Sequence, residues 1–421
     1  MTKLSNHNNV EQLSNGLFLG FESRYQAPIV SISMLLPAGV IHDLSHASGV
    51  ILNEMLFRGA GLLDGRSQML ALEHIGARRS TYLGLHHICI QMTVLEEQFE
   101  KACNLLSDIV FGLHLTKKSF DAAKALAIQN IASLDDNPQE NVMLVARKNH
   151  LPYPYNQNSY GDLNGLKNIN IDSVRNYKST CFVPNGSWIG VAGSIKWVKV
   201  QNQIKSNFSN WKGICPSNSI VKGFKDCQKI IEVPQNASQV HIALMCDGGS
   251  STDIKEIVMN QIMTRILGGA TSGRLFSEIR ERNSLCYSVG SSYGVDKRFA
   301  IISTYAGTTA DRALKTIELM LLEFRKIKKG VSLEEFNRAK TGLVSKILFS
   351  GESTIARAGA ISSDLFRYGH IRSLENKVNL VMSITHEEFQ DFLSIKKFGT
   401  PTLAHIGSLK GSIDKELILD D

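Results

Sequence analysis

The sequence contains the same pattern of apolar residues twice. Residues 27–39, APIVSISMLLPAG, match residues 238–249, SQVHIALMCDGG, and both alternate as a strand does before ending at small residues. Residues 99–131 match residues 311–347, and each of these stretches holds two helical patterns separated by a Lys-rich turn, with Ser or Thr capping the second helix. The chain is therefore constrained to fold as a repeated unit.

A third matching pair supports the duplication. NGSWIGVAGS at 185–194 and TPTLAHIGS at 400–408 each read as a strand that ends at glycine. All three pairs lie at a nearly constant offset, which predicts two copies of one α+β unit. The segment 209–227 is rich in Ser, Gly and Lys, as exposed connectors are. We therefore predict an N-terminal domain at 1–215 and a C-terminal domain at 224–421.

Each copy alternates strands with long helices, which predicts an α/β sandwich with helices on one face of a sheet. The chain has 421 residues, whereas single cores usually stop growing near ~250 residues, so two domains are also expected from length. Two such domains can close like the halves of a clamshell, and a cleft between domains is a common binding site. We expect this clamshell arrangement around a central cleft.

Composition excludes several function classes. The net charge of +7, from 46 basic and 39 acidic residues, is spread along the chain, and the densest basic runs, KIKKG and KKFG, are typical of helix ends. No apolar run reaches the ~20 residues of a membrane-spanning helix, and the start resembles neither a secretory signal nor a mitochondrial presequence. The seven cysteines are scattered without a CxxC pair, which argues against disulfides or a thiolate zinc site. We expect a cytoplasmic protein without nucleic-acid or membrane partners.

The strongest functional candidate is the segment 272–289, SGRLFSEIRERNSLCYSV, which places Arg280 and Tyr287 seven residues apart. From spacing alone, the simpler interpretation is that Arg280 pairs with Glu278 or Glu281 and that Tyr287 packs in a core. The preceding LGGATSG indicates a tight turn before a helix. A phosphate-binding loop is a weaker alternative, because the segment does not end in GK[ST].

This segment carries a family resemblance. Together with MLFRG at 55–59, LEHIGA at 72–77, LDDNP at 134–138 and the duplication, it resembles the pitrilysin/insulinase family of zinc peptidases, which includes mitochondrial processing peptidase. The similarity covers roughly residues 25–415. Family members of this size work as dimers, or as pairs in which one chain brings the metal and the other an Arg and a Tyr.

The resemblance implies roles for Arg280 and Tyr287. In the family, residues at these positions lie across the cleft from zinc and hydrogen-bond the substrate peptide near its scissile carbonyl. A guanidinium group and a phenol are donors that suit a carbonyl oxygen and an oxyanion. We therefore expect both residues to contribute to catalysis on peptides.

The resemblance also locates a degenerate zinc motif. Active members carry His-x-x-Glu-His directly before Met-Leu-Phe-x-Gly, so MLFRG places Val50 and Glu54 where the two His ligands would be and Asn53 where Glu would activate water. The third ligand position falls on Asn130. Catalytic zinc usually takes three protein ligands, whereas Val50 has no lone pair and an amide is a poor donor. We expect no metal in this chain, with zinc on a partner.

Four other histidines are candidate metal ligands. His42 and His46 have the i, i+4 spacing of two ligands on one helical face, with Asp43 where HExxH peptidases carry Glu. The simpler interpretation is that Asp43 or Ser45 caps the following helix. The adjacent histidines at 86–87 lie in a strand-like segment, where neighbours point to opposite faces, so they are expected to be ordinary half-buried residues.

Three functions follow from these expectations. The first is a non-metal subunit that lends Arg280 and Tyr287 to a zinc-bearing homologous subunit in a heterodimer, with self-association left open. The second is a wholly non-catalytic structural or peptide-holding family member. The third is a self-sufficient hydrolase that uses the HDLSH segment.

Overall fold

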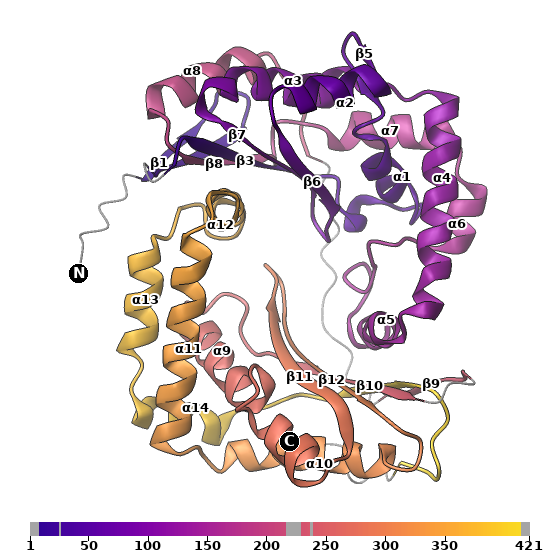
Figure 1. Ribbon diagram of the computed structural model, residues 1–421, viewed down its shortest axis with the longest axis vertical. Helices are drawn as coiled ribbons and strands as arrows, with labels where there is room; N and C mark the ends of the chain where they lie inside the picture. The colour runs from indigo at the N-terminus through magenta and orange to yellow at the C-terminus, as the bar shows by residue number, and fades with distance from the viewer. Residues whose placement is uncertain (1–7, 25–26, 216–228, 236–238, 414–421) are drawn as a thin grey trace. The chain divides into compact units, whose positions relative to one another are not determined.

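The computed structural model describes residues 8–24, 27–215, 229–235 and 239–413 (Figure 1). They form two compact units: unit 1 within 1–132, 157–220 and 348–375, and unit 2 within 133–156, 221–347 and 376–421. Most of the predicted connector at 209–227 lies outside the described residues.

Unit 1 is built on a six-stranded sheet in the order β1-β2-β8-β3-β7-β6. Its strands are β1 Asn8–Gln12, β2 Phe18–Ser23, β3 Ile29–Leu36, β6 Arg78–Leu83, β7 Ile88–Leu95 and β8 Trp188–Gly193, with a small hairpin of β4 Gly59–Ala60 and β5 Leu63–Asp64. Its helices are α1 Ser48–Met55, α2 Gly65–His74, α3 Phe99–Gly112, α4 Lys117–Ala132, α6 Leu163–Asn168, α7 Ile171–Cys181, α8 Trp197–Phe208 and α12 Thr354–Tyr368.

Unit 2 is built on a five-stranded sheet in the order β11-β12-β10-β13-β9. Its strands are β9 Lys229–Val233, β10 Val240–Asp247, β11 Cys286–Val295, β12 Ala300–Thr308 and β13 Thr402–Ile406. Its helices are α5 Pro138–His150, α9 Ile254–Gly268, the π-helix η4 Phe276–Arg282, α10 Ala313–Lys328, α14 His386–Ile395 and most of α11 Leu333–Gly351 and α13 Leu374–Ser383.

The two sheets have the same topology, which confirms the predicted duplication. In unit 1, β2 pairs with β8 in parallel, and β3 is antiparallel to both β8 and β7. In unit 2, β9 pairs with β13 in parallel, and β10 is antiparallel to both β13 and β12. The edge strands β6 and β11 are therefore equivalent. Unit 1 has one additional strand, β1, which pairs with β2.

The long helix pairs also lie where the repeat places them. Helices α3 and α4 cover the first matched segment, and α10 and α11 cover the second. In α11, Ser332 and Glu335 form a capping box, because each side chain bonds to the other's backbone N–H, at 2.9 and 3.2 Å. In α4, Thr116 accepts a bond from the N–H of Ser119 at 3.2 Å. The predicted Ser and Thr caps are confirmed.

Alternation along β3 assigns the two faces of the sheet in unit 1. Val30, Ile32 and Met34 belong to the large apolar core, which they share with residues of α1, α3, α4, α7 and α8. The intervening Ser31 and Ser33 point to the other face and are also buried. Both faces of this part of the sheet are therefore covered, whereas the sequence predicted helices on one face only.

Helix α12 covers the second face, although it follows α11 in the C-terminal half of the chain. Ser31 Oγ lies 2.8 Å from Thr354 Oγ1, and Ser33 Oγ lies 3.1 Å from Ser362 Oγ. In the same way α5, from the N-terminal half, belongs to unit 2, where it packs on β10 and β13. Equivalent helices of the two halves are thus exchanged between the units.

Close approach of α12 to the sheet requires a glycine on β8. A Cβ at Gly190 would lie 2.2 Å from the carbonyl oxygen of Ala358 and 2.8 Å from the backbone nitrogen of Ser362. These are backbone atoms, so the helix itself would have to move. Because the backbone of α12 fills the space that a Cβ would occupy, only glycine fits at this position of β8.

We therefore predict that Gly190→Ala destabilises the protein by about 1–3 kcal/mol, the usual cost of overpacking. Urea unfolding measures this free energy. The matched control is Gly359→Ala on α12 itself, where a Cβ meets only the end of the Gln91 side chain at 3.2 Å and alanine favours the helix. Equal stability of the two variants would contradict the close packing described for Gly190.

A buried ion pair also joins α12 to β2. Arg357 on α12 donates from Nε to both carboxylate oxygens of Glu22, at 3.1 and 3.2 Å, and Nη2 donates to Oε2 as well. Arg24 Nη1 adds a bond to Glu22 Oε1 at 3.3 Å. Glu22 is 0% and Arg357 2% exposed, so both charges depend on each other for solvation.

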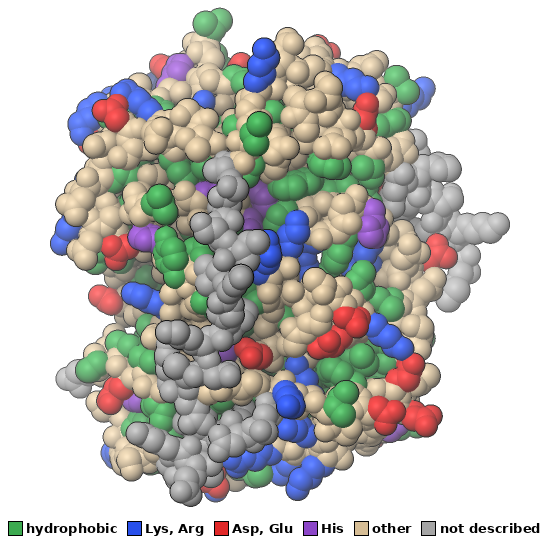
Figure 2. All heavy atoms as spheres, turned by 180° about the vertical axis from the view of Figure 1, so that it is seen from behind, with side chains coloured by type: hydrophobic (Ala, Val, Ile, Leu, Met, Phe, Trp, Pro, Cys, Tyr) green, Lys and Arg blue, Asp and Glu red, His purple; other side chains and the backbone are tan. Residues whose placement is uncertain are grey.

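Charged side chains are spread over the surface, as the sequence predicted. On the face drawn in Figure 2, basic and acidic side chains are interspersed. Within the described part of the chain, no helix combines the length and the apolar character that crossing a membrane requires.

Candidate functional site

The predicted zinc-motif positions lie in unit 1 on α1. Val50 is in the apolar core, and Asn53 Oδ1 is buried with no hydrogen-bond partner among the described residues. Burial raises the pKa of the Glu54 carboxyl, and the nearby Arg58 lowers it to a smaller extent. Helix α4, which carries Asn130, packs against α1. The positions that the family motif assigns to the metal ligands and the catalytic base thus offer one carboxylate, two amides and an apolar side chain.

The position of Val50 is filled by packing. A Cβ at Gly161 would lie 3.1 Å from Val50 Cγ2 and 2.6 Å from the carbonyl oxygen of His46. That same oxygen accepts a bond from the N–H of Asp162 at 2.9 Å. The segment that contains Gly161 therefore packs against the start of α1 beside Val50.

The HDLSH segment is not helical. His42 ends the 3-10 helix η1 Val40–His42, and His46 has a left-handed φ of 54°. Asp43 accepts bonds from the N–H and hydroxyl of Ser45, at 3.0 and 2.6 Å, and from the N–H of Gly49 at 2.8 Å. Asp43 and Ser45 thus bond N–H groups of the first turn of α1, although Ala47 stands at the N-cap position itself, and the segment offers no helical face for paired ligands at i and i+4.

Burial also disfavours the charged form of His42. Desolvation, with a smaller contribution from His86, lowers its pKa to about 4. Among the described residues, no group of three or more His, Cys, Asp or Glu side chains is arranged to hold a metal ion.

The adjacent histidines at 86–87 lie in the turn between β6 and β7, not within a strand as the sequence indicated. Both rings contact Phe366 of α12, at centroid distances of 5.1 and 4.5 Å, and His87 also meets Trp188 edge-on at 5.2 Å. The segment alternates as a strand on either side, and this pattern hid the turn. Their role as packed, partly buried residues is confirmed.

Arg280 and Tyr287 both lie in unit 2, on consecutive elements. Helix α9 ends at Gly268, and the turn that follows closes through a 2.9 Å bond from the N–H of Gly273 to the carbonyl of Ala270. The chain then enters η4, which carries Arg280, and continues into β11, which carries Tyr287. The LGGATSG segment is thus a tight turn before a helix, as predicted.

Arg280 presents its guanidinium group to solvent. Glu278 pairs with Arg282, and Glu281 accepts a bond from the Ser277 hydroxyl at 3.2 Å, so neither acid is paired with Arg280. The guanidinium carbon lies 4.9 Å from the centroid of the Phe276 ring, and this cation–π contact orients it without occupying its donors. The simpler sequence interpretation, an ion pair with Glu278 or Glu281, is wrong.

Tyr287 is 60% exposed and sits at a β-bulge. The register between β11 and β12 shifts between Cys286 and Ser288, so Tyr287 is the extra residue of the bulge. Bulges commonly redirect a side chain beside a functional site. A tyrosine packed in a core, the alternative read from the sequence, is not found.

Arg280 also acts on Cys286, the residue before Tyr287. Burial raises the pKa of the Cys286 thiol to about 11, and the Arg280 guanidinium partly opposes this shift. Arg280 is therefore close enough to act on the residue that precedes Tyr287. The η4 helix packs directly on β11. One short segment thus presents an exposed cation and an exposed phenol together.

Comparison with known proteins identifies the family of this chain. Residues 21–156 match the family model of Insulinase (Peptidase family M16), and residues 168–343 match that of the Peptidase M16 inactive domain. The chain belongs to the peptidase M16 family. This is the pitrilysin/insulinase group that the sequence motifs resembled, so the recognition from sequence is confirmed.

Curated M16 relatives span nearly the whole chain. An uncharacterized zinc protease of Rickettsia felis is 23% identical over 90% of this chain and 92% of its own length. The uncharacterized zinc protease YmxG of Bacillus subtilis is 23% identical over 91% of this chain and 90% of its own length. A peptidase M16 inactive domain from Pseudomonas fluorescens shares the fold, with a TM-score of 0.87 at 18% identity, and covers 97% of this chain and 100% of that one.

Several residues that contact or support the Arg280 segment of this M16 chain were not predicted from the sequence. Phe276 lies beneath the guanidinium group, and Arg274 pairs with Glu335 on α11. One signal was available, because Ser332 and Glu335 have the spacing of a capping box that fixes the start of α11. No pattern in the sequence connects that box to Arg274, which is 61 residues away.

Proposed function

We propose that this chain is the non-metal subunit of a two-chain M16 peptidase. It lends Arg280 and Tyr287 to the zinc site of a homologous partner that supplies the metal. The observation that carries this proposal is the contrast between the two units. Unit 2 presents Arg280 and Tyr287 exposed and unpaired among the described residues, whereas the zinc-motif positions of unit 1 lack ligands.

The residues present in this chain do not fit a catalytic zinc ion. Val50 offers no donor atom, and Asn53 and Asn130 offer neutral amides, which leaves Glu54 as the single carboxylate. Catalytic zinc sites use three His, Glu or Asp ligands. The chain's own contribution to peptide cleavage must therefore come through hydrogen bonding.

Arg280 and Tyr287 have the chemistry for that contribution. A guanidinium group donates in a fixed fork, and a phenol donates one further bond, so together they suit a peptide carbonyl oxygen that gains negative charge. Both are exposed at a short helix and a bulge, so a peptide held by the partner subunit reaches them without displacing packed side chains.

We predict that the purified chain binds no stoichiometric zinc at this site. The reason is the shortage of ligands on α1 and α4. Metal analysis after dialysis measures the zinc content of wild type and of Glu54→Gln. About one zinc ion per chain, lost in Glu54→Gln, would contradict the prediction.

Co-expression tests the proposed partnership. The chain is produced with a homologue from the same source that contains an intact His-x-x-Glu-His motif, and cleavage of an internally quenched peptide is followed. Activity of the pair above that of either chain alone supports the proposal. Recovery of the chain only in a larger assembly without peptidase activity would support a structural or peptide-holding role instead. Chelator-sensitive cleavage by the isolated chain would contradict both.

A further inference from the structure

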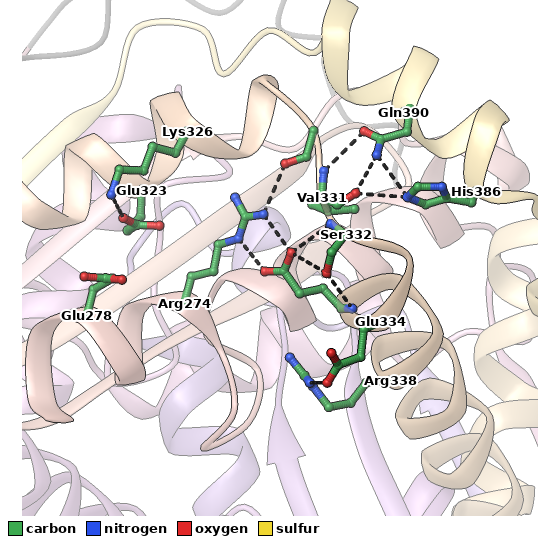
Figure 3. A network of polar contacts seen from close by, with 12 residues as sticks. Arg274, Glu278, Glu323, Lys326, Val331, Ser332, Glu334, Arg338, His386 and Gln390 are labelled. Atoms are coloured by element: carbon green, nitrogen blue, oxygen red, sulfur yellow. Dashed lines mark hydrogen bonds and ion pairs between the residues drawn. The ribbon is translucent and has the colours of Figure 1, made fainter. Parts of the chain in front are cut away.

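We infer that Arg274 and Glu335 are positioning residues that hold the helix bearing Arg280 in the place where it meets substrate. This inference rests on the proposed function, because the role of Arg280 in contacting substrate is part of that proposal. The structural basis is an ion pair that joins the chain just before η4 to the start of α11 (Figure 3).

The pair is bidentate. Arg274 Nε donates to Glu335 Oε1 at 2.7 Å and Nη2 donates to Oε2 at 3.0 Å. The same Nη2 also donates to the carbonyl oxygen of Gly330 at 3.1 Å. The two side chains are only 18% and 21% exposed, so water competes weakly for these bonds. A planar fork of this kind fixes orientation as well as distance.

Glu335 is held on its other side as well. Its Oε2 accepts bonds from the N–H of Ser332 at 2.9 Å and from the Ser332 hydroxyl at 3.1 Å. The hydrogen bond from Arg274 is the main reason that the pKa of Glu335 falls to about 2. A carboxylate with a lowered pKa stabilises the fold above its unfolded pKa of about 4.3, and this contribution is lost only as the pH falls towards 2. The pair is therefore intact throughout the neutral range.

The turn between α10 and α11 is a rigid support for Arg274. Gln390 of α14 accepts a bond from the N–H of Val331 at 3.2 Å and donates to the carbonyl of the same residue. His386 Nε2 lies 3.0 Å from that carbonyl oxygen. Figure 3 shows these groups converging on the turn beside the Arg274–Glu335 pair. The anchor is thus tied to two helices of unit 2.

The helix that follows needs such an anchor. A π-helix is rare and occurs mostly as a short segment within an α-helix, frequently at a functional site. Here η4 carries Arg280. At its other end, Arg312 donates to the carbonyl of Ser284 at 2.9 Å, where the chain leaves the helix with a φ of 52°. Arg274 holds the first end and Arg312 the second.

Hydrogen exchange on the isolated chain tests the anchoring step without a partner. Arg274→Lys and Glu335→Gln are expected to speed amide exchange in residues 276–285 by roughly tenfold. In these variants, local opening of the helix no longer has to break the bidentate ion pair. The matched control is Glu334→Gln, which removes the exposed pair with Arg338 on the same helix and does not contact Arg274. The inference is overturned if exchange in 276–285 stays at the wild-type rate, or if the control changes it equally.

The reconstituted pair tests the positioning step. Arg274→Lys and Glu335→Gln are expected to lower kcat by about tenfold to a hundredfold with a smaller change in KM, since misplacing a group near the reacting atoms costs rate. Arg274→Lys retains the charge and is expected to lose less than Arg274→Ala. Equal kcat in wild type and all three variants would overturn the positioning role.

The two failures are distinguishable. If Arg280→Ala and Tyr287→Phe reduce cleavage while the Arg274 and Glu335 variants do not, the positioning inference fails and the proposed function stands. If Arg280→Ala and Tyr287→Phe leave cleavage unchanged, the proposed function fails, and the exchange experiment still reports whether the ion pair anchors η4.

Discussion

Replacing Arg280 with alanine is expected to lower kcat/KM of the reconstituted pair by on the order of 10²-fold to 10³-fold, the usual loss when one oxyanion donor is removed. The physical reason is that its guanidinium group is exposed, has no acidic partner among the described residues and lies over the ring of Phe276. Steady-state cleavage of the quenched peptide measures the loss. Tyr287→Phe, which deletes only the phenolic donor, is expected to act in the same direction.

The same helix provides the control. Arg282 is 71% exposed and pairs with Glu278, so Arg282→Ala removes a guanidinium group of the same helix that is already engaged. Exposed pairs of this kind contribute about 0–1 kcal/mol to stability, and Arg282→Ala is expected to leave kcat/KM near the wild-type value. Loss of activity in this control equal to that of Arg280→Ala would mean that general disturbance of the helix, not a specific donor, explains the effect.

Arg357→Ala is expected to destabilise the folded chain by about 3–5 kcal/mol, because it removes the bidentate partner of the buried Glu22 carboxylate. Urea unfolding measures the free energy. Glu22→Gln together with Arg357→Met removes both charges of the pair and is expected to cost less than Arg357→Ala alone, since no carboxylate is left buried without Arg357, while Arg24 loses only its single bond to Glu22.

An exposed pair again sets the scale for this stability prediction. Arg175 and Asp172 pair at 2.8 Å on α7, with side chains 52% and 80% exposed. Arg175→Ala should cost no more than about 1 kcal/mol. If Arg357→Ala and Arg175→Ala destabilise equally, burial does not strengthen the Arg357–Glu22 pair in the way described.

The repeat allowed much of the fold to be predicted. Matched strands at 27–39 and 238–249 became β3 and β10 in sheets of the same topology, and the matched helical stretches became α3 with α4 and α10 with α11. The exchange of α5 and α12 was not predictable. Apolar spacing shows that a helix buries one face, but it carries no information on which sheet that face meets.

The candidate site was predicted in part. The motif around Arg280 identified the segment, but the sequence SEIRE has ordinary helical spacing, so neither the π-helix nor the pairing of Glu278 with Arg282 could be predicted from it. The i, i+4 spacing of HDLSH was misleading, because His46 has a left-handed backbone conformation that a regular α-helix does not allow. Local geometry of this kind depends on tertiary contacts that spacing does not encode.

The exchanged helices have a consequence for how such a protein changes over time. Because α5 completes the second sheet and α12 the first, neither half of the gene encodes a self-contained body, and trimming the chain to one repeat would strip a sheet of its cover. Both copies must therefore be inherited together at a fixed one-to-one ratio. Under that linkage each copy is free to acquire substitutions of its own.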